Sequence, residues 1–114
     1  MNFVVIGATK GLGLCLTKQL LEAGHRVAAG AIVISAELEA LKAQYPDSLL
    51  VLEADVTDEA QMISVAEKAG AFLGEIDGLC NVAGVLLDGD RVKLLHECDI
   101  SELRRTLDVN TVGP

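Results

Sequence analysis

The chain has 114 residues, a net charge of −8 and 51% hydrophobic residues, of which few are aromatic. This length suffices for the core of one domain, and an apolar content of mainly Val, Leu, Ile and Ala suits parallel strands covered by helices. The acidic charge argues against nucleic acid as the main partner, because phosphate contacts along a nucleic acid need clustered Lys and Arg.

The first predicted element is a short buried strand, 3–6, followed by the glycine-rich turn Gly7–Gly13. Where such a turn opens a helix, free N–H groups and the positive end of the helix dipole both favour a phosphate. Gly11 would let a pyrophosphate approach the backbone, and Gly13 would let the helix lie close to the sheet. The spacing is G-x-x-x-G-x-G rather than G-x-G-x-x-G, so an ordinary strand-to-helix turn is the alternative interpretation.

Helices and strands then alternate along the chain. We expect a first helix over 11–23 and strands over 26–31, 49–52 and 78–83. The inward positions expected in the first helix are Leu12, Cys15, Leu16, Gln19 and Leu20.

Two further helices begin at recognisable caps. Ser35 is predicted to cap a short helix that ends near Tyr45, and a capping box at Asp58–Gln61 to open a helix through residue 71 or 72. In the latter helix, the residues expected to face inward are Ile63, Ala66 and Ala69 or Gly70. Past the fourth strand we expect a loop at Asp88–Asp90 and a last helix opened by a capping box at Asp99–Glu102.

This order of elements is typical of an α/β fold with a doubly wound parallel sheet, Rossmann-like and of about four strands. Residues 1–114 are therefore predicted to form one domain. In such folds the ligand lies across the carboxyl ends of the strands, at the point where the strand order reverses.

Three segments fall at predicted carboxyl ends and would line one crevice: Gly7–Gly13, Asp55–Thr57 and Asn81–Gly84. Asp55 is suited to accept a hydrogen bond from an adenine amino group, and Val56 to pack on the ring. The small residues at 83 and 84 would let a ribose lie against the backbone. Each segment also has a purely structural interpretation, as a turn residue, a local hydrogen-bonding side chain or a strand terminator.

Targeting and cysteine patterns narrow the class of protein. The longest apolar run, 27–34, is much shorter than the roughly 18 residues needed to cross a membrane. Met1 and Asn2 lead directly into the first strand, which predicts a cytoplasmic protein. Cys15, Cys80 and Cys98 show no C-x-x-C spacing, so we expect neither a disulfide framework nor a metal site, and Cys15 and Cys80 are predicted to be small core residues.

Four motifs together resemble the short-chain dehydrogenase/reductase family. Gly7–Gly13 matches its T-G-x-x-x-G-[IL]-G loop, Ala54–Asp58 its D-V-[TS] segment, Asn81–Gly84 its N-N-A-G segment and Asp108–Asn110 the V-N at the start of its catalytic helix. The resemblance covers all 114 residues, with the motifs in the family's order and spacing.

The resemblance implies NAD(P)-dependent hydride transfer between a nicotinamide and a small-molecule carbonyl or alcohol. It also implies the roles of individual residues. Asn110 would be the asparagine of the catalytic Asn-Ser-Tyr-Lys set, and the implied cofactor-binding residues are Gly7, Thr9, Lys10, Gly11, Leu12, Gly13, Asp55, Val56, Asn81, Ala83 and Gly84.

The chain departs from the family pattern at three points. Ile6 replaces a Thr whose hydroxyl normally ties the loop to a neighbouring strand, so we expect a looser loop, and Val82 replaces the second Asn of N-N-A-G. The catalytic Ser and Y-x-x-x-K are absent, and Tyr45, which precedes a proline, cannot replace them. We therefore predict the cofactor-binding part of an oxidoreductase, incomplete relative to the family and inactive alone.

The preferred cofactor is partly predictable. An NAD site usually has an acid at the end of the second strand, whereas the segment Ala29–Ile34 has none. Lys10 is suited to pair with a 2′-phosphate, which favours NADP over NAD, although a solvated loop lysine is the alternative.

A second function class stays open: a non-catalytic nucleotide-binding or assembly module. The fourth strand would present an unprotected edge beside apolar surface, so we hypothesise that the chain forms a homo-oligomer.

Overall fold

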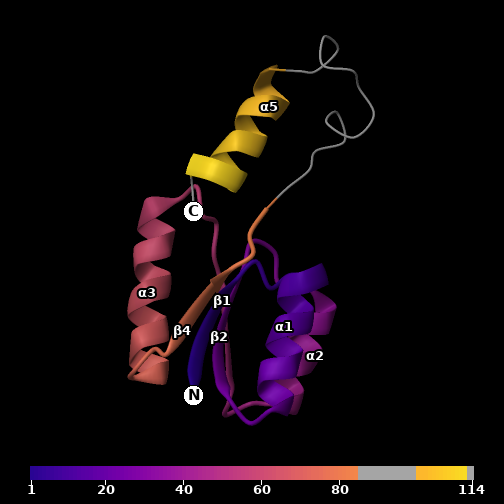
Figure 1. Ribbon diagram of the computed structural model, residues 1–114, viewed down its shortest axis with the longest axis vertical. Helices are drawn as coiled ribbons and strands as arrows, with labels where there is room; N and C mark the ends of the chain where they lie inside the picture. Colours follow the sequence, from indigo (N-terminus) through magenta and orange to yellow (C-terminus); the bar gives the residue numbers. More distant parts are fainter. Residues whose placement is uncertain (85–99, 113–114) are drawn as a thin grey trace.

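The structure is a computed structural model in which residues 1–84 and 100–112 are described. Its centre is a parallel sheet of four strands in the order β3-β2-β1-β4 (Figure 1). The strands are β1 (Asn2–Ile6), β2 (Arg26–Ala31), β3 (Leu49–Glu53) and β4 (Gly78–Asn81). The strand order reverses between β1 and β4, which confirms the predicted Rossmann-like α/β class.

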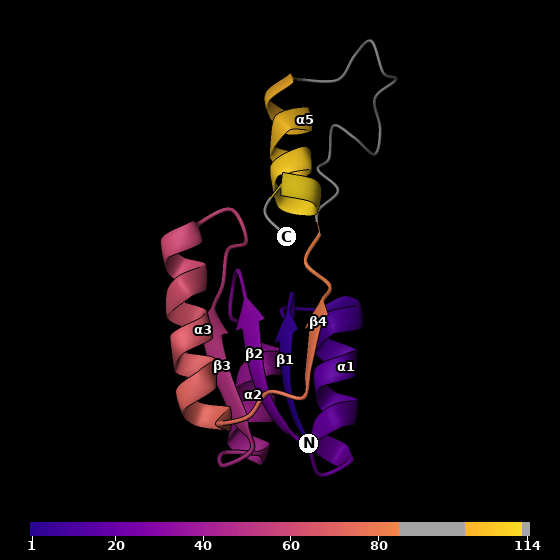
Figure 2. The same cartoon turned by 60° about the vertical axis from the view of Figure 1, so that its left-hand side comes forward.

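Helices cover both faces of the sheet. Figures 1 and 2 show α1 (Gly11–Glu22) and α2 (Ala36–Gln44) on one side and α3 (Glu59–Leu73) on the other. The helix α5 (Ile100–Leu107) and the π-helical turn Asp108–Val112 lie beyond the carboxyl ends of the strands. The architecture is therefore a three-layer α/β/α arrangement in which the carboxyl ends of the strands lie beneath α5.

Successive residues of the central strands pack on opposite layers, because side chains alternate across a strand. Val4 and Ile6 of β1 join the cluster under α3, whereas Val5, fully buried between them, joins the cluster under α1 and α2. Both faces of β1 are thus apolar, as expected for a parallel strand in the middle of a sheet.

The buried face of α1 differs from the predicted one. The buried residues are Gly13, Thr17 and Leu21, the predicted Leu16 and Leu20 are half-buried against the same core cluster, and Leu12 is 73% exposed. Small residues face inward because the helix lies close to the sheet, and the buried Thr17 hydroxyl is satisfied by donating to the Gly13 carbonyl at 2.8 Å. The prediction of a core role for Cys15 was also wrong, since this side chain is exposed.

In α3 the inward prediction was correct for Ala69 alone. The buried residues are Val65, Ala69 and Leu73, spaced four apart, while Ile63 is 54% exposed. Ala66 is exposed as well and Gly70 is half-buried. This helix is rich in alanine, so the predicted face and the buried face have similar hydrophobicity. Packing against the sheet, which the sequence does not show, decides which of the two faces is buried.

Most element boundaries lie within one or two residues of the predicted ones. Strand β4 is shorter than predicted, because it ends at Asn81 and not at Ala83. Beyond it, Val82 donates the last ladder bond to Ile6, and the Asn81 side-chain oxygen accepts from the Ala83 N–H, which turns the chain out of the sheet. Ile100–Leu107 confirms the last helix, whereas Asp88–Asp90, Cys98 and Asp99 lie outside the described residues.

Across residues 1–84 and 100–112, no helix combines the length and the hydrophobicity needed to cross a membrane.

Candidate functional site: a cleft at the carboxyl ends of the strands

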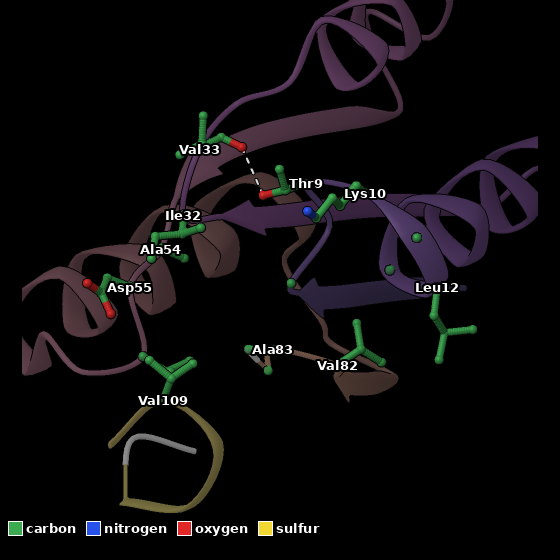
Figure 3. A pocket seen from close by; sticks show the side chains of 15 residues that line it. Thr9, Lys10, Leu12, Ile32, Val33, Ala54, Asp55, Val82, Ala83 and Val109 are labelled. Atoms are coloured by element: carbon green, nitrogen blue, oxygen red, sulfur yellow. Dashed lines mark hydrogen bonds between the residues drawn. The ribbon is translucent and has the colours of Figure 1, made fainter. Parts of the chain in front are cut away.

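A cleft of about 610 Å³ opens where β1, β2, β3 and β4 end. Its volume falls in the usual range for small-molecule sites, roughly 300–1,000 Å³. The residues around it come from five separate segments of the chain (Figure 3). The lining residues are Gly7, Thr9, Lys10, Gly11, Leu12, Gly13, Ile32, Val33, Ala54, Asp55, Val56, Val82, Ala83, Gly84 and Val109.

The glycine loop is fixed mainly by its own backbone. Gly7 turns the chain out of β1 with φ +95°, and the N–H groups of Gly7 and Ala8 both donate to the Gly30 carbonyl of β2, at 2.9 and 3.0 Å. A Cβ atom at Gly13 would collide with the Gly7 carbonyl oxygen, so the predicted close approach of α1 is confirmed. On the Cβ side of Gly11 there is no described atom within 4 Å.

Ile6 uses its side chain for packing, and the looser loop expected from it stays a prediction. Its side chain is 4% exposed and packs in the cluster under α3, close to the Cα of Gly30. Another hydroxyl of the loop makes a hydrogen bond, since the Thr9 Oγ1 donates to the Val33 carbonyl at 2.8 Å. The loop is therefore tied to the chain that follows β2.

The amino end of α1 points at the cleft without a side-chain cap. Its N-cap residue is Lys10, which makes no capping hydrogen bond, and no acidic residue lies in the first turn. A helix end of this kind keeps free N–H donors and an uncompensated positive dipole end, both of which attract an anion.

Asp55 lies opposite the loop, in the turn after β3. Its Oδ1 accepts from the N–H and the hydroxyl of Thr57, and the Arg105 guanidinium of α5 lies 3.7 Å from its Oδ2. The hydrogen bonds from the Thr57 hydroxyl and N–H lower the pKa of Asp55, burial opposes them, and the Arg105 guanidinium adds to the lowering. The carboxylate is thus ionised at neutral pH, when it can accept a hydrogen bond.

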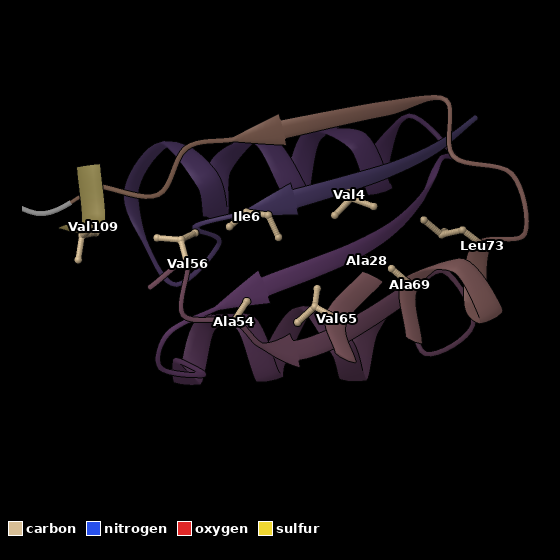
Figure 4. Close-up of a cluster of buried hydrophobic side chains, with 9 residues drawn as sticks. All are labelled: Val4, Ile6, Ala28, Ala54, Val56, Val65, Ala69, Leu73 and Val109. Carbon is tan, nitrogen blue, oxygen red and sulfur yellow. The ribbon is translucent and has the colours of Figure 1, made fainter. Parts of the chain in front are cut away.

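The floor between Asp55 and the loop is apolar. Ala54, Val56 and Val109 belong to the buried cluster under α3, so the turn after α5 is joined to the sheet by hydrophobic contact (Figure 4). Arg105 also donates to the Thr57 hydroxyl at 3.3 Å, which is a second link from α5 to this edge. An aromatic ring would find flat aliphatic surface here.

Most of the predicted site residues meet in this cleft. Two lie outside its lining: Asn81, whose side chain serves the Ala83 N–H, and Asn110, which is exposed on the π-helical turn with its Oδ1 near Gly84. The sequence analysis missed five lining residues, all apolar: Ile32, Val33, Ala54, Val82 and Val109. Each follows a strand end or belongs to a motif already noted, and that position was the available signal.

The described residues contain no group of three or more His, Cys, Asp or Glu side chains placed to hold a metal ion.

A family model for short chain dehydrogenases matches residues 2–114. The chain belongs to this family. It is 36% identical over 110 residues to a 1-deoxy-11-beta-hydroxypentalenate dehydrogenase of Streptomyces avermitilis, covering 94% of this chain and 40% of the relative. It is 30% identical over 113 residues to an NADP-dependent 3-hydroxy acid dehydrogenase of Escherichia coli, covering 99% and 44%.

A solved structure with the same fold is similar to this chain. It is a 3-ketoacyl-(acyl-carrier-protein) reductase from Brucella melitensis complexed with NADH, with a TM-score of 0.86 and 25% identity over 98% of this chain and 45% of that one. The chain thus spans less than half the length of these relatives.

Proposed function

We propose that this chain of a short-chain dehydrogenase binds a nicotinamide dinucleotide in the cleft at the strand ends. The observation that carries the proposal is the uncapped amino end of α1. Beside it, Gly11 has no side chain, and no described atom lies within 4 Å of the place where its Cβ would be. A pyrophosphate fits such an end because backbone N–H groups replace its hydration without a bulky side chain in the way.

The residues around the cleft suit the remaining parts of the cofactor. Asp55, held as an anion by Thr57, suits an adenine amino group, and Val56 suits the ring face. Asn110 is the proposed catalytic asparagine, and the proposed cofactor-binding residues are Gly7, Thr9, Lys10, Gly11, Leu12, Gly13, Asp55, Val56, Asn81, Ala83 and Gly84.

Isothermal titration of the purified chain with NADPH and NADH tests this proposal. We expect binding of at least one cofactor, and no binding at about 1 mM, the upper end of ordinary enzyme KM values, would contradict it.

Between the two cofactors we propose a preference for NADP. The cleft wall after β2 presents Ile32 and Val33, 49% and 63% exposed, and offers no carboxylate for a ribose 2′-hydroxyl. Lys10 lies in the same cleft, where its ammonium is suited to a 2′-phosphate. Lys10→Ala should weaken NADPH more than NADH, and an unchanged affinity ratio would defeat the assignment.

We propose further that these 114 residues alone transfer no hydride. Their single tyrosine, Tyr45, is followed four positions later by Leu49 rather than by a lysine. The Y-x-x-x-K pair that moves the proton in the family is thus not found among these residues. Stereospecific deuteride transfer from labelled NADPH to a carbonyl compound, catalysed by the purified chain, would contradict this proposal.

An assembly role is the second candidate, and it rests on the β4 edge. Within the described residues β4 pairs with β1 alone, and Leu79 on this strand is 67% exposed. An open strand edge beside apolar surface can pair with a second copy of the chain. Small-angle scattering should then show dimers or larger species, whereas a monomer at high concentration would count against this role.

A further inference from the structure

The carbonyl and hydroxyl groups of Thr9 are both bonded to the segment that joins β2 to α2. The Thr9 hydroxyl donates to the Val33 carbonyl at 2.8 Å, and the Ser35 hydroxyl donates to the Thr9 carbonyl at 2.6 Å. Residues 24 to 26 positions apart in sequence are thereby joined in two places. We call these two hydrogen bonds the Thr9 clamp.

Ser35 has a second task in the same place. While it donates to Thr9, its oxygen accepts from the Leu38 N–H at 3.2 Å and so caps α2. Because Leu38 is fully buried, the cap is anchored to the core between α2 and the sheet. The Ser35 hydroxyl thus connects Thr9 to the buried start of α2.

The clamp adjoins the part of the cleft proposed to hold the ribose 2′ group. Lys10 follows Thr9 directly, and Val33 accepts the clamp bond and also lines the cleft (Figure 3). Lys10 itself makes no side-chain capping bond at the start of α1. A flexible lysine selects an anion well only if its backbone is held at a fixed distance from the opposite wall, which here carries Ile32 and Val33.

We propose that Thr9 and Ser35 are positioning residues that fix Lys10 against the wall after β2 and thereby set the preference for a 2′-phosphorylated cofactor. This inference rests on the proposed binding of NADP by Lys10. Thr9 lines the cleft as part of the proposed cofactor-binding loop, and its effect on the choice of cofactor comes through its hydrogen bond to Val33.

The test compares NADPH and NADH affinity, by titration calorimetry, in Thr9→Val, Thr9→Ser, Ser35→Ala and Ser35→Thr. Thr9→Val keeps the shape and loses the hydroxyl, and Ser35→Ala loses the second bond. In both, the NADPH-to-NADH affinity ratio should fall roughly fivefold, the worth of an exposed ion pair. Thr9→Ser and Ser35→Thr keep the hydroxyls and should keep the ratio.

Asp58→Ala is the matched control for stability, because it removes the corresponding cap from α3 without touching the clamp. It should lower the melting temperature about as much as Ser35→Ala does and leave the ratio unchanged. An unchanged ratio in Thr9→Val, or equal weakening of both cofactors, would overturn the inference. Lys10→Ala separates the two proposals. If it lowers the affinity ratio and the clamp variants do not, Lys10 selects NADP but the Thr9 clamp does not position it. If Lys10→Ala leaves the ratio unchanged, both proposals are contradicted.

Discussion

The amino ends of α1, α2 and α3 differ in whether a side chain caps their free N–H groups. Ser35 and Asp58 cap α2 and α3, each accepting from an N–H three residues on, and both helices carry acidic residues in their first turn. The end of α1 has neither a side-chain cap nor an acid. All three helices pack on the same sheet, so the difference in capping is local to each amino end. The ends of α2 and α3 are capped, which stabilises them, whereas the end of α1 is uncapped where it faces the cleft.

The open end has a stability cost that a capped end avoids, because a good cap contributes about 1 kcal/mol. A bound phosphate would supply the missing acceptors only when the cofactor is present. The comparison thus separates residues whose loss lowers the free energy of unfolding from residues whose loss lowers cofactor affinity.

The largest effect is expected at the closest contact of the open end. In Gly13→Ala the new Cβ meets the Gly7 carbonyl oxygen, backbone that cannot move aside, so the free energy of unfolding should fall by about 3 kcal/mol or more. Gly70→Ala in α3 is the control, since nothing lies within 4 Å of its Cβ, and it should raise stability by about 0.5–1 kcal/mol. Similar urea midpoints for the two variants would contradict the close packing.

A negative charge placed at the uncapped end of α1 should raise stability and lower NADPH affinity. Leu12 is 73% exposed, so Leu12→Asp loses little burial and should stabilise α1 by about 0.3–1 kcal/mol through its dipole. The same charge repels a pyrophosphate, and NADPH affinity should fall about tenfold by calorimetry. Leu12→Asn isolates the charge from the change of size. If Leu12→Asp binds NADPH as tightly as the wild type does, the pyrophosphate does not lie at the amino end of α1.

The capped end of α3 should respond in the opposite way. Asp58→Ala leaves the Gln61 N–H without its acceptor, so the free energy of unfolding should fall by about 1 kcal/mol, while NADPH affinity measured at a temperature well below melting stays unchanged. Asp58→Asn retains a capping oxygen and should recover most of the loss. A drop in affinity without a drop in stability would show that the two kinds of helix end are not distinct.

The smallest effect is electrostatic and concerns Asp55. Its pKa is lowered in the folded chain, chiefly by the Thr57 hydroxyl and N–H, so the carboxylate stabilises the fold above the unfolded value of 3.8, and this stabilisation is lost as the pH falls through the folded pKa. Asp55→Asn should therefore be less stable than the wild type at neutral pH, with a difference that disappears on acidification. Thr57→Val should weaken this pH dependence, and a difference independent of pH would refute its origin.

Local patterns were enough to predict the alternation of elements, the caps at Ser35 and Asp58 and the glycine loop. They predicted half of the capping box at Asp58: the Asp58 carboxylate accepts from the Gln61 N–H as expected, but the Gln61 side chain accepts from the Asp55 N–H instead of returning to Asp58. The local rule considers partners within four residues, whereas the folded chain brought the turn after β3 within reach.

The sequence by itself determined which segments end at the edge that holds the cleft, because strand and helix signals are local and parallel strands end on the same side. The tertiary structure alone decided three things. It selected Gly13, Thr17 and Leu21 as the inward face of α1, it joined Thr9 to Ser35, and it brought α5 to Asp55 through Arg105. Each depends on the distance between segments far apart in the chain, which is set by how closely helices and sheet pack.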